Sequence, residues 1–316
     1  MPGKPFDDGR ADDSGVAVRA PAAVLCPVDF SEPSRGALRY AAVIAAHVGA
    51  RLVVLTVNDP LLAQAADMAN GAGSLDADAK AETTRFFHDT FSSPPPGVLV
   101  QFAVATGKPD AEILRVANAG SADLIVMSSR GATGIRRLFL GSITERVLRA
   151  TTVPVVVTPP GDPGPESKDH VEKTVRRILV PVDLTGAMQD QVRVARHLGS
   201  ILGAPLLLAH VIEPVRAFIP GHIHAANVDS ERRDRAERSL QALADAFPPP
   251  PRTEPLVVFG EPAEEIAKIA ADRQTGLIVM GLHASAVSGA RMGSVTYRVL
   301  SVTHALVLAL PPPYAS

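Results

Sequence analysis

The sequence predicts an α/β protein with two repeated domains, each a sandwich of a five-stranded parallel sheet between helices. Three observations predict this fold class: the chain repeats itself at long spacing, short apolar runs alternate with helical patterns, and the apolar runs are uninterrupted. Strands that are apolar on both faces and alternate with helices are typical of parallel sheets covered on each side. At 316 residues, the chain is long enough for two such domains.

The internal repeat fixes the expected domain boundaries. The sequence VLCPVDFS at 24–31 recurs as ILVPVDLT at 178–185, and LIVM at 124–127 recurs unchanged at 277–280. Solenoid repeats have periods of roughly 20–50 residues, so this longer spacing indicates a duplicated domain. We expect a disordered N-terminal tail over 1–20, a first domain over 21–158, a Pro- and Gly-rich linker over 159–175 and a second domain over 176–311.

The first elements of the domain follow from local patterns. The buried run at 24–28 predicts a strand. Ser31 is suited to cap a helix that starts near Pro33, because apolar residues then follow at steps of three and four. A second apolar run at 52–57 predicts the next strand.

The rest of the domain has one weak region. Residues 60–78 are poorly patterned, and a short helix ending near Pro94 is expected after them. A third strand follows at 98–104. Pro109 suits a first helical position, where its missing N–H costs nothing. The remaining elements are expected as strands at 123–127 and 153–157, with a helix at 142–150.

Composition excludes several function classes. The net charge of −2 gives no basic surface for a nucleic acid, and the absence of Trp removes one stacking platform. The apolar runs have strand length, so we expect no membrane span and no secretory signal, and hence a cytoplasmic protein. Cys26 is the single cysteine, which excludes an intramolecular disulfide and a cysteine metal cluster.

Two loops at the carboxyl ends of predicted strands are candidates for ligand binding, because ligands of open parallel sheets bind there. The first loop carries Asp29. The second, at 128–142, is unusually long for a compact domain and ends in Gly141-Ser142, which opens a helix. Helix N-termini attract anions. The glycines and arginines that favour such a site are Gly131, Gly134, Gly141, Arg130, Arg136 and Arg137.

Each candidate also has a purely structural interpretation. Ser142 and Glu145 have the spacing of a capping box, which would satisfy the first helical N–H groups without a ligand. Asp29 stands at a strand-to-helix junction, where a turn or N-cap role is common. The long loop is not required by capping, and it favours the anion site.

At Gly131 and Gly141-Ser142 the sequence resembles the universal stress protein family. Nucleotide-binding members carry Gly, two residues, Gly, nine residues, Gly and then Ser or Thr. Here Gly131, nine residues and Gly141-Ser142 match, whereas Ser128 replaces the first glycine. The resemblance covers both copies nearly end to end. It implies the adenine nucleotide alpha hydrolase-like, or HUP-type, fold, with antiparallel pairing of edge strands at 153–157 and 307–310.

The resemblance implies ATP, together with Mg²⁺, as the ligand of the first domain. Pro27, Val28 and Asp29 would line the base and ribose, and Val57 would pack against adenine. The residues implied around the ribose and phosphates are Met127, Ser128, Arg130, Gly131, Gly141, Ser142, Ile143 and Thr144.

The second copy is expected to form a weaker site. His283 or Ala284 stands where the first copy has Gly131, and this would strain the backbone if that position requires positive φ. Arg291 is the remaining basic residue of its loop. The pair His222 and His224 lacks a third ligand nearby, so no metal site is expected. The implied second-site residues are Asp183, Val211, Gly281, Gly293 and Ser294.

The sequence therefore predicts a non-catalytic ATP-binding protein of the stress response, with no set of residues that forms a nucleophile, a base and an orienting group. Two alternatives stay open: a slow ATPase in which Asp29 holds a metal, and a nucleotide-free tandem interaction scaffold. Apart from the adenine nucleotide, the expected partners are the two domains of one chain, joined as a pseudo-dimer, and a second copy in a homodimer.

Overall fold

The computed structural model describes residues 20–70, 73–91, 93–131, 140–184, 188–214, 223–282 and 292–312. The described strands of the first domain are β1 (Ala23–Pro27), β2 (Arg51–Asn58), β3 (Leu99–Thr106), β4 (Leu124–Ser128) and β5 (Val155–Thr158). Those of the second domain are β6 (Ile178–Pro181), β7 (Leu206–Ile212), β8 (Thr253–Phe259), β9 (Leu277–Gly281) and β10 (Leu306–Leu310).

Helices alternate with these strands. The first domain contains α1 (Glu32–Val48), α2 (Pro60–Asn70), α3 (Ser74–Thr90), α4 (Pro109–Val116) and α5 (Ser142–Ala150). After α6 (Lys168–Thr174), the second domain contains α7 (Met188–Leu202), α8 (Ile223–Asp245), α9 (Pro262–Asp272) and α10 (Ser294–Val302). The predicted start of α1 is confirmed, because Ser31 caps it and its Oγ accepts a hydrogen bond from the Ser34 N–H at 3.3 Å.

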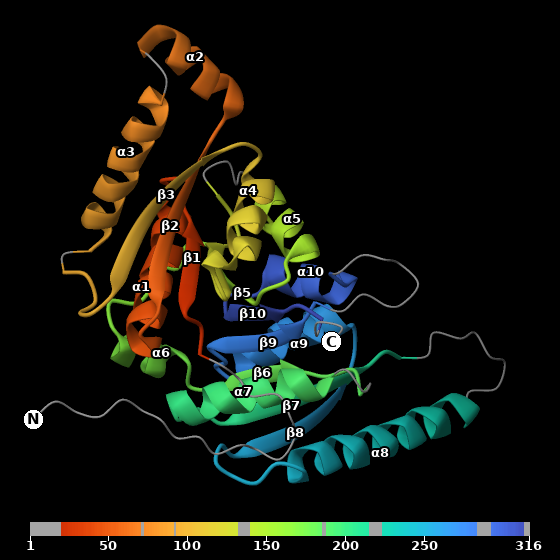
Figure 1. Cartoon of the computed structure of the whole chain (residues 1–316). Helices are drawn as coiled ribbons and strands as arrows, with labels where there is room; N and C mark the ends of the chain where they lie inside the picture. Colours follow the sequence, from red (N-terminus) through yellow and green to blue (C-terminus); the bar gives the residue numbers. More distant parts are fainter. Residues whose placement is uncertain are drawn as a thin grey trace, which may run out of the picture.

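The strands form one ten-stranded sheet in the order β3-β2-β1-β4-β5-β10-β9-β6-β7-β8. Strands within each domain are parallel, whereas β5 and β10 pair antiparallel, with Val156 opposite Leu308. Figure 1 shows the first domain above and the second below this junction. The predicted α/β fold, its duplication and the pairing of its edge strands are therefore confirmed.

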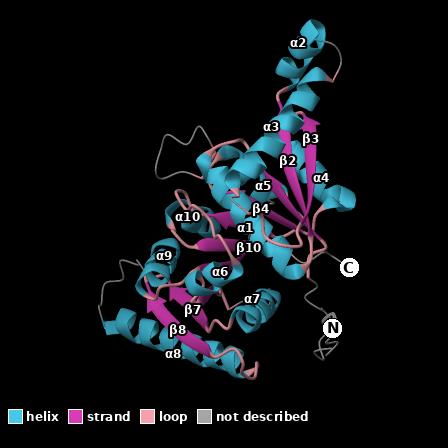
Figure 2. Cartoon of the chain, turned by 90° about the vertical axis from the view of Figure 1, so that its left-hand side faces the viewer, coloured by secondary structure: helices cyan, strands magenta, loops and turns pink. Residues whose placement is uncertain are grey.

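Two apolar layers cover the faces of the sheet. Because successive side chains of a strand point to opposite faces, Val24 and Cys26 of β1 belong to one layer and Leu25 to the other. Helices α1, α3, α7 and α8 pack on the first layer, and α4, α5, α9 and α10 pack on the second. Figure 2 shows helices on both sides of the strands. Each layer runs through both domains, so the junction lies inside a shared core.

The region at 60–78 differs from its prediction. It holds the whole of α2 and the beginning of α3, a helix of 17 residues rather than the short helix expected. Helix α2 leaves its large apolar side chains in solvent, with Leu61 75% and Met68 79% exposed, and it projects beyond the sheet in Figures 1 and 2. The buried face of α3 includes small polar residues such as Thr83. Neither helix therefore shows the ordinary apolar pattern.

The segment predicted as a linker is packed against the first domain. The Tyr40 hydroxyl on α1 donates a hydrogen bond to Asp162 Oδ2 at 2.8 Å. The Arg39 guanidinium donates to the Pro163 carbonyl oxygen, also at 2.8 Å. A β-carbon at Gly36 would overlap the Asp162 carbonyl oxygen, so this glycine permits the close approach. The segment also contains α6, which contacts α1.

Across the described residues, we find no helix with both the length and the apolar character needed to cross a bilayer.

Candidate functional site

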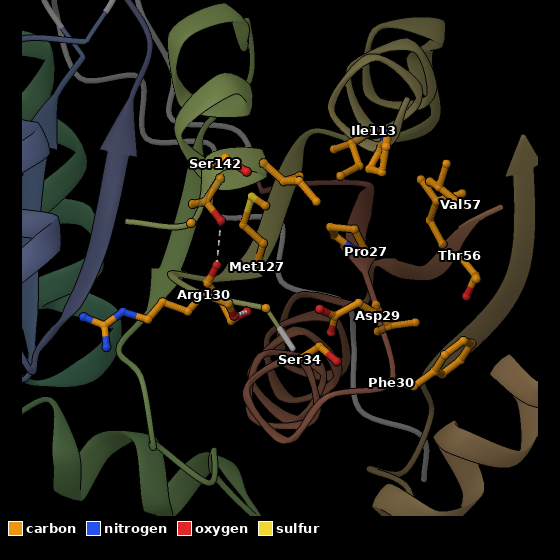
Figure 3. Close-up of a pocket in the computed structure, with 18 residues that line it drawn as sticks. Pro27, Asp29, Phe30, Ser34, Thr56, Val57, Ile113, Met127, Arg130 and Ser142 are labelled. Carbon is orange, nitrogen blue, oxygen red and sulfur yellow. Dashed lines mark hydrogen bonds between the residues drawn. The ribbon is translucent and has the colours of Figure 1, made fainter. Parts of the chain in front are cut away.

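The order of the strands places a crevice between β1 and β4 in the first domain. Strand β1 pairs with β2 on one side and β4 on the other, so the winding direction reverses there. Such a switch point opens a crevice at the carboxyl ends of the strands. A cavity of about 420 Å³ occupies this position (Figure 3). Its volume lies in the range of small-molecule sites, roughly 300–1,000 Å³.

All residues predicted for the first site line this cavity. They come from the ends of β1, β2 and β4 and from the first turn of α5. The structure thus brings together segments that are about a hundred residues apart in the chain. Sequence reasoning missed other lining residues, namely Phe30, Ser34, Leu55, Thr56, Pro109 and Ile113.

Helix α5 begins without a side-chain cap. Gly141 is its N-cap, with φ −62° and ψ 138°, and in the described part of the chain it provides no side-chain cap hydrogen bond. Glu145 instead pairs with Arg149 on the next turn, at 2.9 Å. The capping-box alternative is therefore wrong, because Ser142 is already the first helical residue and Glu145 faces the wrong way. The amide hydrogens of this turn stay available to an anion in the cavity.

The start of α5 is fastened to the end of β4. The buried Thr144 hydroxyl donates a hydrogen bond to the Ser128 carbonyl oxygen at 2.9 Å. The Gly141 N–H donates to the Ser129 carbonyl oxygen at 2.8 Å. These two bonds fix the direction in which the free amide hydrogens of α5 point. A site built this way is preorganised, so little ordering is required when a ligand binds.

The two glycines of the motif are needed because neighbouring atoms leave no room for a β-carbon, not because the backbone has a positive φ. Gly131 is not in the left-handed region, and a β-carbon there would overlap Asp29 Oδ2. A β-carbon on Gly141 would lie 3.1 Å from the Ser129 carbonyl oxygen. The condition under which a residue other than glycine would be strained at the middle position, a positive φ, is therefore not met in the first domain. The obstacle there is the Asp29 carboxylate.

Asp29 has a structural role as well as a place in the cavity. Its Oδ1 accepts hydrogen bonds from the Ser31 N–H, at 3.2 Å, and from the Ser31 hydroxyl. Ser31, not Asp29, is the N-cap of α1. The carboxylate therefore shapes the turn between β1 and α1, and it is held in one orientation at the cavity wall (Figure 3).

The opposite part of the cavity is apolar. Pro27, Val57, Ile113 and Met127 line it. In Figure 3, Ile113 and Val57 lie on the right, Pro27 lies in the middle, and Met127 lies nearer to Ser142 and Arg130. Thr56 precedes Val57 on β2, and its hydroxyl hydrogen bonds to the Thr83 hydroxyl on α3 at 2.6 Å. The missed residue Ile113 carried a signal in the sequence, because α4 begins at Pro109 and places it one turn later, on the buried face.

The structure describes one of the three arginines predicted beside the anion. Arg130 lines the cavity, but in Figure 3 its guanidinium points away from the other labelled side chains. Gly134, Arg136 and Arg137 lie outside the described residues. Their role beside an anion stays a prediction.

The second domain contains a cavity of similar size, about 430 Å³, at the equivalent switch point. All five residues predicted for the second site line it. Gly293 is the N-cap of α10 without a side-chain cap, and the Thr296 hydroxyl donates to the Gly281 carbonyl oxygen at 3.3 Å. Since β5 and β10 are antiparallel, the two cavities open at opposite rims of the sheet.

For several sequence candidates the structure gives no side-chain position. His222, His283, Ala284 and Arg291 are not among the described residues, and the side chain of His224 is not described. Within the described part of the chain, no three His, Cys, Asp or Glu side chains are grouped so as to hold a metal. Burial raises the pKa of the Cys26 thiol, which favours the protonated, unreactive form.

Comparisons with known proteins agree with this geometry. The model of the "Universal stress protein family" matches residues 22–159 and 174–311. A universal stress protein of Thermus aquaticus is 31% identical over 134 residues, which are 42% of this chain and 96% of that protein. Universal stress protein MJ0531 of Methanocaldococcus jannaschii is 43% identical over 61 residues, 19% of this chain and only 36% of its relative's length.

Among solved structures, a universal stress protein from Archaeoglobus fulgidus has a similar fold. It superposes with a TM-score of 0.59 at 20% sequence identity. The superposition covers 93% of this chain and 97% of that one, so the likeness includes both domains.

Proposed function

The chain belongs to the universal stress protein family, and from this premise we propose that it is a non-catalytic ATP-binding protein of the stress response. The first domain holds the nucleotide, which acts as a signal or a stabilising ligand. The observation that carries this proposal is the uncapped N-terminus of α5 at the edge of a preformed cavity. Anions bind at such helix starts because free N–H groups and the helix dipole both favour negative charge.

The other residues of the cavity fit the remaining parts of ATP. The apolar group of Val57, Ile113 and Met127 suits a planar base. Gly131 and Gly141 allow the backbone to come close to the ribose and phosphates, since neither has a side chain in the way. Asp29, held by Ser31, presents its carboxylate at the wall between these two regions, where it accepts hydrogen bonds from ribose hydroxyls.

The same geometry supports binding rather than turnover. Asp29 carries the one carboxylate among the described lining residues. The N–H and the hydroxyl of Ser31 already donate hydrogen bonds to it. Activation of a water for attack on a phosphate requires a base within hydrogen-bond reach of that water. We therefore assign Asp29 to orientation of the ligand.

Equilibrium dialysis of purified full-length protein against ATP tests the proposal. We expect saturable binding that the first domain dominates. Absence of binding at millimolar ATP would remove the proposal. Phosphate release measured beside an Asp29→Ala variant separates binding from hydrolysis: equal release from the two proteins supports a non-catalytic role, and release that depends on Asp29 supports a slow ATPase.

A further inference from the structure

We infer that the two cavities select different classes of ligand, and that the second takes a nucleoside-like molecule without phosphates. This inference rests on the proposed function of the first cavity. It comes from a comparison of the two sites position by position, because the repeat gives each lining residue of one domain an equivalent in the other.

The apolar parts of the two cavities have four residue types in common, whereas Phe30 and Leu55 line only the first and Ala209 takes the place of Leu55 in the second. Each contains a Pro and a Val from the first two strands, an Ile from the helix after the third strand and a Met from the fourth. In the second domain these residues are Pro181, Val211, Ile266 and Met280, equivalent to Pro27, Val57, Ile113 and Met127. A planar base that fits the first cavity therefore meets these four side chains again in the second.

The acidic residue after the second strand is used differently in the two domains. In the first, Asp59 Oδ1 accepts a hydrogen bond from the Leu61 N–H at 2.8 Å and so caps α2, away from the cavity. In the second, the equivalent Glu213 lines the cavity, and no described side chain pairs with its carboxylate. The Arg232 guanidinium donates a hydrogen bond to the main-chain oxygen of Glu213, at 3.0 Å, and not to its carboxylate.

A histidine replaces a threonine beside this acid. Thr56 of the first domain is bonded to Thr83 on α3. The equivalent His210 lines the second cavity, and its Nδ1 lies 2.8 Å from the Val182 carbonyl oxygen. A carbonyl oxygen only accepts hydrogen bonds, so Nδ1 carries the hydrogen, and Nε2 of the neutral ring is an acceptor. This part of the cavity thus suits a ligand with N–H or O–H donors.

The charges of the described lining residues point the same way. In the first cavity they are Asp29 and Arg130, whose guanidinium points away from the other labelled side chains in Figure 3, so Asp29 is the one acid. In the second they are two acids, Asp183 and Glu213, with no described Lys or Arg. Two carboxylates repel a triphosphate at the start of α10 and accept hydrogen bonds from amino and hydroxyl groups. Nucleosides have those donors and lack the repelled charge.

Calorimetric titration of the full chain tests the inference with adenosine and ATP as probes. With ATP at saturation, we expect the natural protein to take up one adenosine in addition to one ATP. Glu213→Gln should raise the ATP affinity of the second site about tenfold by removing one like charge. Adding His210→Thr, the residue of the first domain, should strengthen that gain. Glu231→Gln removes an equally exposed charge of α8 outside the cavity and should change nothing.

Three results decide the matter. Two ATP molecules bound with equal affinity to the natural chain would overturn the inference, as would no uptake of adenosine beside ATP. A third result is that the natural chain binds adenosine but no ATP, and that only the Glu213→Gln variant binds ATP. This result would refute the proposed function of the first domain and support the selectivity of the second. Because the Glu213 side chain is exposed, this single variant keeps the test decisive if His210→Thr does not fold.

Discussion

Asp29 and Gly131 are fitted to one another: the carboxylate oxygen Oδ2 of Asp29 occupies the space that a β-carbon on residue 131 would need. Gly131→Ala should therefore push the carboxylate from the cavity wall and weaken ATP binding about tenfold, a change that dialysis can measure. The effect should largely vanish in an Asp29→Ala background, because the overlap is gone. Equal losses in both backgrounds would show that the two residues are not coupled.

Gly141→Val should abolish ATP binding to the first domain. Its β-carbon would lie 3.1 Å from the Ser129 carbonyl oxygen, and its methyl groups would cover the first amide hydrogens of α5. Gly293→Val makes the same change at the start of α10 and is the matched control. Dialysis against ATP should show loss only for Gly141→Val; retained binding in that variant would contradict the role given to α5.

Thr144→Val should destabilise the chain by about 1–3 kcal/mol, because it leaves the buried Ser128 carbonyl oxygen without its donor. Thr296→Val, the equivalent change, should cost less, since that bond is longer, at 3.3 Å. Urea unfolding followed by circular dichroism compares the two. Equal losses of unfolding free energy in the two variants would show that the shorter bond of Thr144 stabilises the chain no more than the longer bond of Thr296.

Tyr40 should make the stability of the chain fall at alkaline pH. Burial first, and then the charge and hydrogen bond of Asp162, raise the pKa of Tyr40 above its ordinary value. Above about pH 10, the ordinary tyrosine pKa, the unfolded chain releases this proton while the folded chain keeps it. The unfolded state then binds fewer protons, so stability falls by up to about 1.4 kcal/mol per pH unit.

The test of this pH dependence is the difference between the natural chain and Tyr40→Phe. The variant loses the hydrogen bond to Asp162, about 1 kcal/mol at neutral pH, and its stability should fall less steeply above pH 10. Cys26, whose pKa is also raised by burial, contributes equally to both proteins and cancels. Parallel profiles of unfolding free energy against pH would refute the assignment to Tyr40.

The repeat made most of the fold predictable from sequence. Strands buried on both faces are continuous apolar runs, and the helix at 142–150 was predicted with the bounds that α5 has. Helix α2 was not predicted, and α3 was expected only as a short helix, because hydrophobic periodicity reports burial. Leu61 and Met68 are apolar but exposed, and Thr83 is polar but buried. The apolar pattern therefore indicates neither which residues of these helices are buried nor which are exposed.

The candidate site was predictable in its residues but less so in its details. Loops at the ends of parallel strands converge, which indicated the two loops of the site, and the resemblance to the universal stress protein family implied the individual lining residues. The role of Ser142 depended on a shift of one residue: as N-cap it would compete with a ligand, and as first helical residue it does not. A sequence gives helix starts less accurately than that. Likewise, the contact between Gly131 and Asp29 joins distant positions, and no local pattern reports it.

The antiparallel pairing of β5 with β10 has a consequence for how such a chain evolves. Two separate subunits meet only as often as their concentration allows, and each change in one copy is also made in the other. Once both are encoded as one polypeptide, encounter is guaranteed at any dilution, and mutations fall on one half alone. The junction therefore allows each half to change what it recognises while the two halves stay joined.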